Sequence, residues 1–163
     1  MPTARITAFL EAIGIAVVPA SVPPDGGFLP GIMVSRGELL VDESRLAYPG
    51  DLLHEAGHIA VAPPALRAEL SGSIDLPGVD MGALEVAAVA WSYAAALAIG
   101  LDPAVVFHAG GYRGRSSGLL ATYGAGVYPG ANLLEEAGMT ATGPRAEALG
   151  VPPYPHMLRW LRG

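Results

Sequence analysis

Apolar residues recur every three or four positions in two early stretches of the chain, which is the period of an amphipathic helix. The first stretch follows Thr3, a favourable N-cap, and ends at Gly14. The second follows Asp51, whose side chain also suits an N-cap, and is stopped by Pro63 and Pro64. Both stretches are predicted to be helices that turn an apolar face towards the core.

A third helix is expected over residues 81–99, with Asp80 as its N-cap and Gly100 just beyond its end. The run from Val86 to Leu101 is rich in alanine and carries no charge. It is shorter than the roughly 20 apolar residues that span a bilayer, and Glu85 directly precedes it. We therefore expect a buried core helix and no membrane association.

Two short apolar runs, residues 32–34 and 39–41, are separated by a turn that contains Gly37. Two such runs joined by a short turn are typical of an antiparallel hairpin. Another β-rich run covers residues 15–18. These runs predict a small antiparallel sheet beside the helices.

The second half of the chain is harder to assign because glycine becomes frequent there. Short helical pieces fit residues 103–108, 117–123 and 131–137. The tail, residues 155–161, is expected to form a last docked helix.

A chain of 163 residues suits one domain. The expected fold is therefore α+β, a mainly helical single domain over residues 1–163 with a small antiparallel sheet. Residues 3–100 are expected to hold the functional core, and residues 101–163 have no assigned role.

Composition excludes several classes of function. The chain has no cysteine, which excludes disulfides, cysteine–metal sites and thiol nucleophiles. Its formal net charge is −6 and its 9 basic residues form no large cluster, so nucleic-acid binding is not expected. The N-terminal residues lack the apolar core of a secretory signal, and the expected location is the cytoplasm.

The strongest chemical signal is the HExxH motif at residues 54–58, His-Glu-Ala-Gly-His. Residues four apart lie on one face of a helix, so His54 and His58 can bind the same zinc ion. Glu55 lies about 100° further round the helix, where its carboxylate can accept a proton from a zinc-bound water. Gly57 is small and would let another element approach closely. The motif therefore predicts a zinc site with Glu55 as the general base.

A catalytic zinc ion needs a third protein ligand and one open position. The residue six positions after His58, where metzincins place a third histidine, is Pro64. Glu85 is the favoured third ligand because it is the only charged residue on an apolar helix, where a buried carboxylate needs a partner. Alternatively, it is an exposed first-turn acid favoured by the helix dipole. Other downstream candidates are Glu69, Asp75, Asp80 and His108.

Two supporting roles are left open by the sequence. A hydrolase needs a group that stabilises the developing oxyanion. Asp42, at the end of the hairpin, is either a hydrogen-bond partner of a ligand histidine or a simple strand-end residue. For each candidate oxyanion-stabilising residue, the alternative is ordinary packing or surface exposure. These candidates are His108, Tyr112, Arg113, Tyr123 and Tyr93.

The octapeptide at residues 52–59, LLHEAGHI, follows the predicted hairpin. Glu85 comes 27 residues after His58, on the helix expected over residues 81–99. This order resembles the gluzincins and is most similar to the ImmA/IrrE-like metallopeptidases of bacteria and phages. The resemblance covers residues 3–100. It implies that the two motif histidines and Glu85 bind zinc and that Glu55 is the base. The helix-turn-helix repressors that accompany this family have no visible counterpart here, and residues 101–163 match nothing in it.

The favoured function is zinc-dependent hydrolysis of a peptide or protein substrate. An exposed edge of the hairpin near the metal would bind an extended substrate as an added strand. The alternative is a non-catalytic interaction or sensing module that keeps zinc as a structural element, and a third idea is hydrolysis of a small amide. No pattern in the sequence specifies the substrate, the regulation or the oligomeric state.

Overall fold

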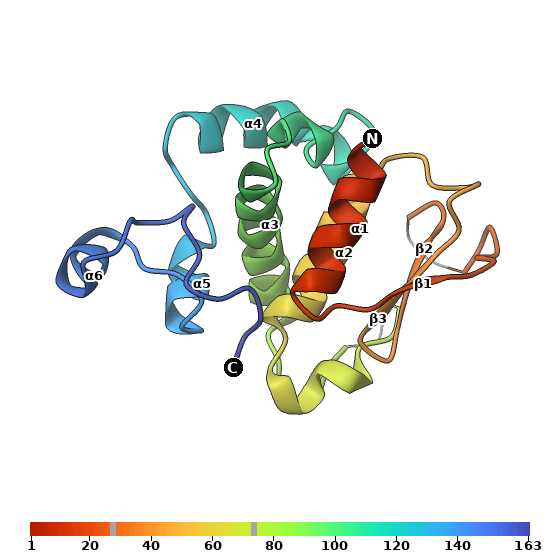
Figure 1. The fold of residues 1–163 in the computed structure, drawn as a ribbon, viewed down its shortest axis with the longest axis horizontal. Helices are drawn as coiled ribbons and strands as arrows, with labels where there is room; N and C mark the ends of the chain where they lie inside the picture. Colours follow the sequence, from red (N-terminus) through yellow and green to blue (C-terminus); the bar gives the residue numbers. More distant parts are fainter. Residues whose placement is uncertain (27–28, 73–74) are drawn as a thin grey trace.

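Six α-helices and a three-stranded sheet make up the part of the chain that the computed structural model describes, residues 1–26, 29–72 and 75–163 (Figure 1). The α-helices are α1 (Pro2–Ala12), α2 (Asp51–Val61), α3 (Met81–Ala98), α4 (Ser116–Gly124), α5 (Ala131–Glu136) and α6 (Gly143–Leu149). Three short 3-10 helices are η1 (Pro64–Glu69), η2 (Pro103–Val105) and η3 (Tyr112–Gly114). The predicted α+β, mainly helical single domain is confirmed.

The centre of the fold is the crossing of α2 and α3, which bury their apolar faces against each other. Gly57 lies at the point of closest approach. A Cβ atom placed on it would be 2.8 Å from the carbonyl oxygen of Ala88 and 3.2 Å from its Cα atom. This confirms the expectation that Gly57 lets another element come near. Glu85 is three residues before Ala88 and therefore shares its side of the helix. The same crossing thus brings Glu85 to α2.

The sheet has the strand order β1-β3-β2. Strands β2 (Ile32–Ser35) and β3 (Glu38–Val41) form the predicted antiparallel hairpin. Arg36 and Gly37 make its turn with φ angles of 51° and 76°, as a two-residue hairpin turn requires. The expectation of a purely antiparallel sheet was wrong, because β1 (Val17–Pro19) pairs with β3 in parallel. The chain returns through the long loop after β1 and through β2 before it enters β3, so β1 and β3 run the same way.

Helix α3 is the buried core helix that its composition predicts. Asp80 is its N-cap and accepts a hydrogen bond from the amide of Ala83 at 3.0 Å, and Gly100 follows its end with a φ of 68°. By length and composition α3 could cross a membrane, but 61% of it is buried inside the protein. Buried core helices can be equally long and apolar, so the burial of α3 inside the protein explains its hydropathy.

Two predicted helix starts were wrong. Helix α1 begins at Pro2, so Thr3 lies inside it. Helix α2 has Gly50 at its N-cap position, and Asp51 is its first helical residue. A Cβ atom at Gly50 would be 1.9 Å from the carbonyl oxygen of Val105. The backbone of η2 therefore occupies the space that a capping side chain needs, and Asp51 is available for another role.

The C-terminal tail passes over α3 and the end of α2 (Figure 1). The hydroxyl of Tyr154 donates to the carbonyl of Ala90 at 2.8 Å, and the indole of Trp91 donates to the carbonyl of Trp160 at 3.0 Å. The predicted helix over residues 155–161 was wrong, since the tail docks through turns and bends. Prolines within and just before this segment remove backbone donors that a helix would use.

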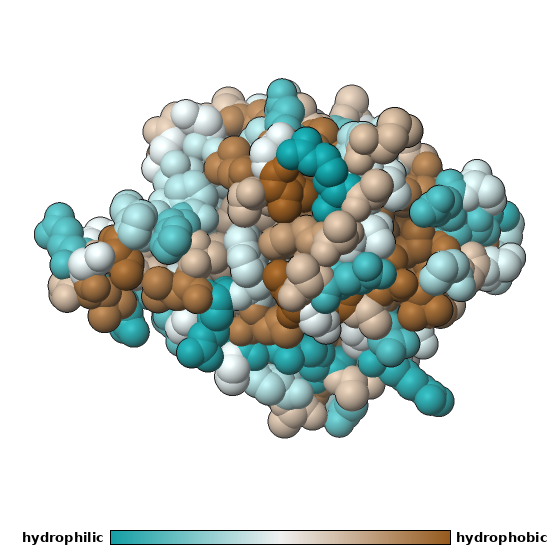
Figure 2. Space-filling model, viewed as in Figure 1, coloured by the Kyte–Doolittle hydropathy of each residue, from teal (hydrophilic) through white to brown (hydrophobic). Residues whose placement is uncertain are grey.

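Helix α6 was not predicted, because its sequence has no helical run of apolar residues. Proline in its first turn and Gly150 at its C-terminal end, with a φ of 66°, favour the helix locally. Ala146 is its only buried residue. The helix projects from the body of the protein, and apolar surface is visible around it in Figure 2. Leu149 is 52% exposed there.

Replacing Gly57 by alanine should destabilise the protein by about 1–3 kcal/mol, because the added methyl group meets the backbone of α3. The same substitution at Gly118 is the matched control. This glycine lies within α4, and its Cβ atom would meet nothing within 4 Å. It should therefore stabilise the protein by about 0.5–1 kcal/mol. Urea unfolding measures both changes. A gain of stability in both variants would contradict the close crossing.

Candidate metal centre

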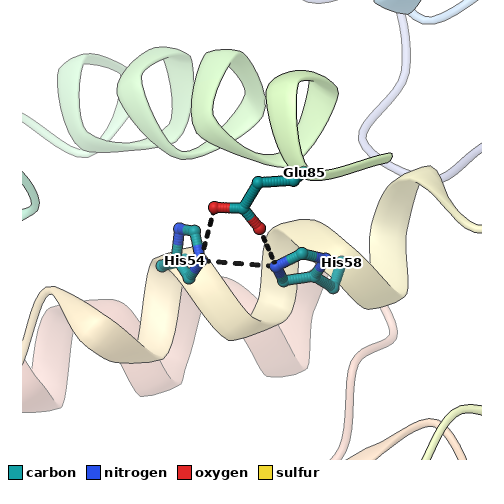
Figure 3. Close-up of side chains that lie close together, drawn as sticks. All are labelled: His54, His58 and Glu85. Atoms are coloured by element: carbon teal, nitrogen blue, oxygen red, sulfur yellow. Dashed lines mark hydrogen bonds and ion pairs between the residues drawn. The ribbon is translucent and has the colours of Figure 1, made fainter. Parts of the chain in front are cut away.

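Three possible metal ligands converge between α2 and α3 (Figure 3). The two histidine Nε2 atoms of His54 and His58 are 3.3 Å apart. The carboxylate of Glu85 reaches down from α3, with Oε1 3.5 Å from Nε2 of His54 and Oε2 2.8 Å from Nε2 of His58. The structure thus brings together the three residues that the sequence predicts as ligands.

The separation of the nitrogens fits a shared metal ion. Two nitrogens bound at about 2.1 Å to one tetrahedral ion lie roughly 3.4 Å apart, close to the observed 3.3 Å. The 2.8 Å contact between His58 and Glu85 has the length of a hydrogen bond. An ion bound there would take the place of the proton between them. The cluster could therefore hold a metal ion through two nitrogens and one oxygen.

The two histidines differ in charge because their surroundings differ. Burial, followed by the neighbouring charge of His58, lowers the pKa of His54 to about 4. Burial also disfavours a charge on His58, but its hydrogen bond to Glu85 and the charges of Glu55 and Glu85 outweigh burial and raise its pKa. The same hydrogen bond lowers the pKa of Glu85. His54 is thus neutral at pH 7, whereas the contact with Glu85 favours the protonated form of His58.

A cavity of about 430 Å³ opens beside the cluster. Glu55 lines it together with the three candidate ligands, and burial raises the pKa of its carboxyl group. Val34, Leu70 and Met81 supply apolar wall. A carboxylate beside a metal position, in a cavity with room for a ligand, is arranged as a general base requires.

Tyr112 contacts the far side of one candidate ligand. Its hydroxyl is 3.1 Å from Nδ1 of His54, and its ring meets the imidazole edge-on at 5.4 Å. If Nε2 faces a metal, Nδ1 carries the proton and donates it to the Tyr112 hydroxyl, which fixes the ring orientation. Tyr112 was predicted only as an oxyanion candidate. The two residues are 58 positions apart, so no spacing could indicate this contact.

The backbone around Tyr112 is held in an unfavourable conformation. Tyr112 and Arg113 have φ angles of 56° and 52°, in the left-handed region, and Gly114 follows at 79°. For a residue with a side chain this conformation costs about 1–2 kcal/mol. Strain of this kind persists only where surrounding contacts impose it, and it is frequent at functional sites.

A buried pair anchors this loop to the start of α2. Nε2 of His108 is 2.6 Å from Oδ1 of Asp51, and the imidazole stacks on the ring of Tyr48 at 3.8 Å. The hydroxyl of Ser116 donates to the carbonyl of His108 at 2.6 Å. Burial raises the pKa of Asp51 although the bond to His108 opposes the rise. His108, a lesser ligand candidate, is therefore bound to Asp51 instead of joining the cluster.

The sequence did not predict the role of Asp51, which was expected to cap its helix. Its position three residues before His54, on a similar side of α2, was the only available signal. His108 Nδ1 is buried and has no hydrogen-bond partner in the part of the chain that the structure describes.

The other aromatic candidates belong to the core. The hydroxyl of Tyr123 donates to the carbonyl of Pro129 at 2.5 Å. Tyr93 packs against Phe107 and Tyr123, with ring centroids 6.1 Å and 4.6 Å away. Tyr93 and Tyr123 are therefore packed core residues, the alternative to an oxyanion-stabilising role. Arg113, in contrast, lines the cavity.

The remaining acidic candidates lie outside the cluster. Asp42 accepts hydrogen bonds from the backbone and hydroxyl of Ser44 and from the amide of Val22, so it is the strand-end residue of the two alternatives. Glu69 and Asp75 are exposed. Of the downstream acids, only Glu85 joins the two histidines among the residues described.

The outer edge of the hairpin is not fully open, contrary to expectation. The carbonyl of Val34 in β2 accepts a hydrogen bond from the amide of Gly72 at 2.9 Å. The segment after η1 therefore covers the edge at Val34, where a substrate strand would have paired. The edge still borders the cavity through the side chain of Val34.

Comparisons with known proteins add no assignment. No protein-family model matches the chain, and searches of curated proteins and of solved structures find no match. The candidate site accordingly depends on its own residues and geometry.

Metal affinity should fall about tenfold for each pH unit below the pKa of His58, because one proton must leave that ring when the ion binds. The raised pKa of His58 places the start of this fall above 6.5, its ordinary value. His54 has a pKa of about 4, so metal binding displaces no second proton, from this ring, until the pH approaches that value. Competition with a metal chelator between about pH 5 and pH 8 measures the slope. A flat profile would contradict the pairing of His58 with Glu85.

Tyr112→Phe should weaken metal binding roughly tenfold, the lower end of the usual loss when a partner of a ligand histidine is removed. Tyr123→Phe is the matched control, because it removes another tyrosine hydroxyl, whose partner in the described part of the chain is a backbone carbonyl. It should leave metal affinity unchanged. The same chelator competition compares the variants. Equal affinities in Tyr112→Phe and wild type would rule out a positioning role.

Proposed function

We propose that the protein is a zinc-dependent metallohydrolase that cleaves peptide bonds. One observation carries the proposal. Two histidines on α2 and a glutamate on α3 converge at metal-binding separations, and a fourth residue, Glu55, faces the same cavity without joining the cluster. Three ligands plus a neighbouring carboxylate are the parts that a catalytic site needs, whereas a structural zinc site has four protein ligands.

Zinc is the metal that the donor set favours. Imidazole nitrogen and carboxylate oxygen are both common ligands of zinc, and two histidines with one glutamate are a known catalytic set. When bound, zinc would supply a water of near-neutral pKa and polarise the substrate carbonyl. The residues His54, His58 and Glu85 would hold it.

Glu55 would carry the proton transfers. Its carboxylate takes a proton from the attacking water and later gives it to the departing amine. Burial raises the pKa of this carboxyl group, which brings it closer to neutrality and improves it as a base and then as an acid. Tyr112 would keep the ring of His54 in its ligating orientation.

The surroundings suit a peptide better than a small amide. The cavity has a volume of about 430 Å³ and several apolar residues in its walls, enough to hold several substrate atoms around a scissile bond. The order of α1, the small sheet, α2 and α3 also supports the proposed resemblance to ImmA/IrrE-like metallopeptidases. That resemblance favours peptide bonds as the target.

Glu55→Gln should keep about one zinc per chain and lose about 100- to 10,000-fold in cleavage rate, because an amide cannot accept the proton. His58→Ala is the control for the metal and should lose both zinc and cleavage. Metal analysis and mass spectrometry of an unfolded-protein digest give the two readouts. Cleavage by Glu55→Gln at the wild-type rate would refute the mechanism. A fully zinc-loaded wild type that cuts nothing would support the non-catalytic module instead.

A further inference from the structure

Arg113 is the one residue with a permanent positive charge among the described residues that line the cavity beside the candidate metal site. Two of the three acidic groups that line the cavity are already occupied, and the third is Glu55. Asp51 is bonded to His108 at 2.6 Å, and Glu85 faces the two motif histidines. In the described chain, no carboxylate lies within 4.0 Å of the Arg113 guanidinium. This arginine is therefore available to an anion that enters the cavity.

The loop geometry directs Arg113 to this position. Tyr112 contacts His54, and the next residue lines the same cavity, although adjacent side chains usually diverge. Consecutive left-handed φ angles of 56° and 52° make this arrangement possible. The pairing of His108 with Asp51 and the bond from Ser116 to the carbonyl of His108 hold the loop at both sides. The loop that carries Arg113 is thus held by fixed contacts beside the candidate metal site.

We propose that Arg113 binds a carboxylate of the peptide substrate and so determines specificity. This inference rests on the proposed peptidase function. A guanidinium binds a carboxylate through two parallel hydrogen bonds, which gives both affinity and orientation. The carboxylate belongs either to the C-terminus of the peptide or to an aspartate or glutamate side chain near the scissile bond. Both sources have the same chemistry, and the experiment separates them.

Binding is measured without cleavage, by calorimetry on the zinc-loaded Glu55→Gln protein. Four acetylated hexaalanine peptides serve as probes: the free acid, its C-terminal amide, and two amidated peptides with a glutamate or a glutamine at the third position. An acidic peptide should bind about tenfold more tightly than its neutral partner, as expected for a charge-assisted pair. Preference for the free acid indicates C-terminal recognition, and preference for glutamate indicates an acidic side chain.

Arg113→Asn should abolish this preference, and Arg113→Lys should keep part of it. Asparagine tolerates the left-handed backbone, so the charge is removed without added strain. The matched control is Arg36→Asn, because Arg36 has nearly the same φ, 51°, and is exposed in the hairpin turn outside the cavity lining. This control should keep the full preference.

Two results would overturn the role of Arg113. One is equal affinity for acidic and neutral peptides, which includes no measurable binding of any of them. The other is a preference that survives in Arg113→Asn, because the carboxylate would then bind the metal itself. Failure of the proposed peptidase function gives a separate result. The wild type then cleaves nothing, while the preference for acidic peptides that depends on Arg113 is still present in binding.

Discussion

The site depends on how closely α2 and α3 can approach each other. The contact between Gly57 and the backbone of Ala88 leaves no room for a side chain. Because Glu85 is three residues before Ala88, this contact also determines how far its carboxylate extends towards α2. A wider crossing would move the carboxylate away from both histidines, even if every ligand stayed in the sequence. The HExxH motif therefore includes a packing residue as well as chemical ones.

The electrostatic arrangement follows from burial around this crossing. Burial keeps His54 neutral, while Glu85 draws a proton to His58. One ring is thus ready to bind a metal, and the other must exchange a proton for it. Glu55 is not one of the three converging groups, and its raised pKa comes mainly from burial. A carboxylate beside three possible ligands distinguishes the arrangement from a closed structural site with four protein ligands.

The second half of the chain completes the cavity rather than forming a separate module. The loop before α4 carries Tyr112 and Arg113 over the site in a backbone conformation that is unfavourable by itself. The bond between His108 and Asp51 holds it there, since an aspartate at the start of α2 ties the loop to the helix that carries the two histidines. The C-terminal tail then bonds to α3 through Trp91 and to the end of α2 through the carbonyl of Ala60.

The sequence by itself determined the helices α2 and α3, the hairpin, and the candidate ligands, because these depend on local spacing. Four-residue periodicity places His54 and His58 on one face, and isolation on an apolar helix indicates Glu85. Local spacing holds no information on contacts between distant segments. Only the tertiary structure therefore decided the parallel third strand, the pairing of Asp51 with a histidine 57 positions away, and the delivery of Tyr112 to His54. Each of these contacts arises from tertiary packing, because it depends on the shape and polarity of the surfaces that distant segments present to each other.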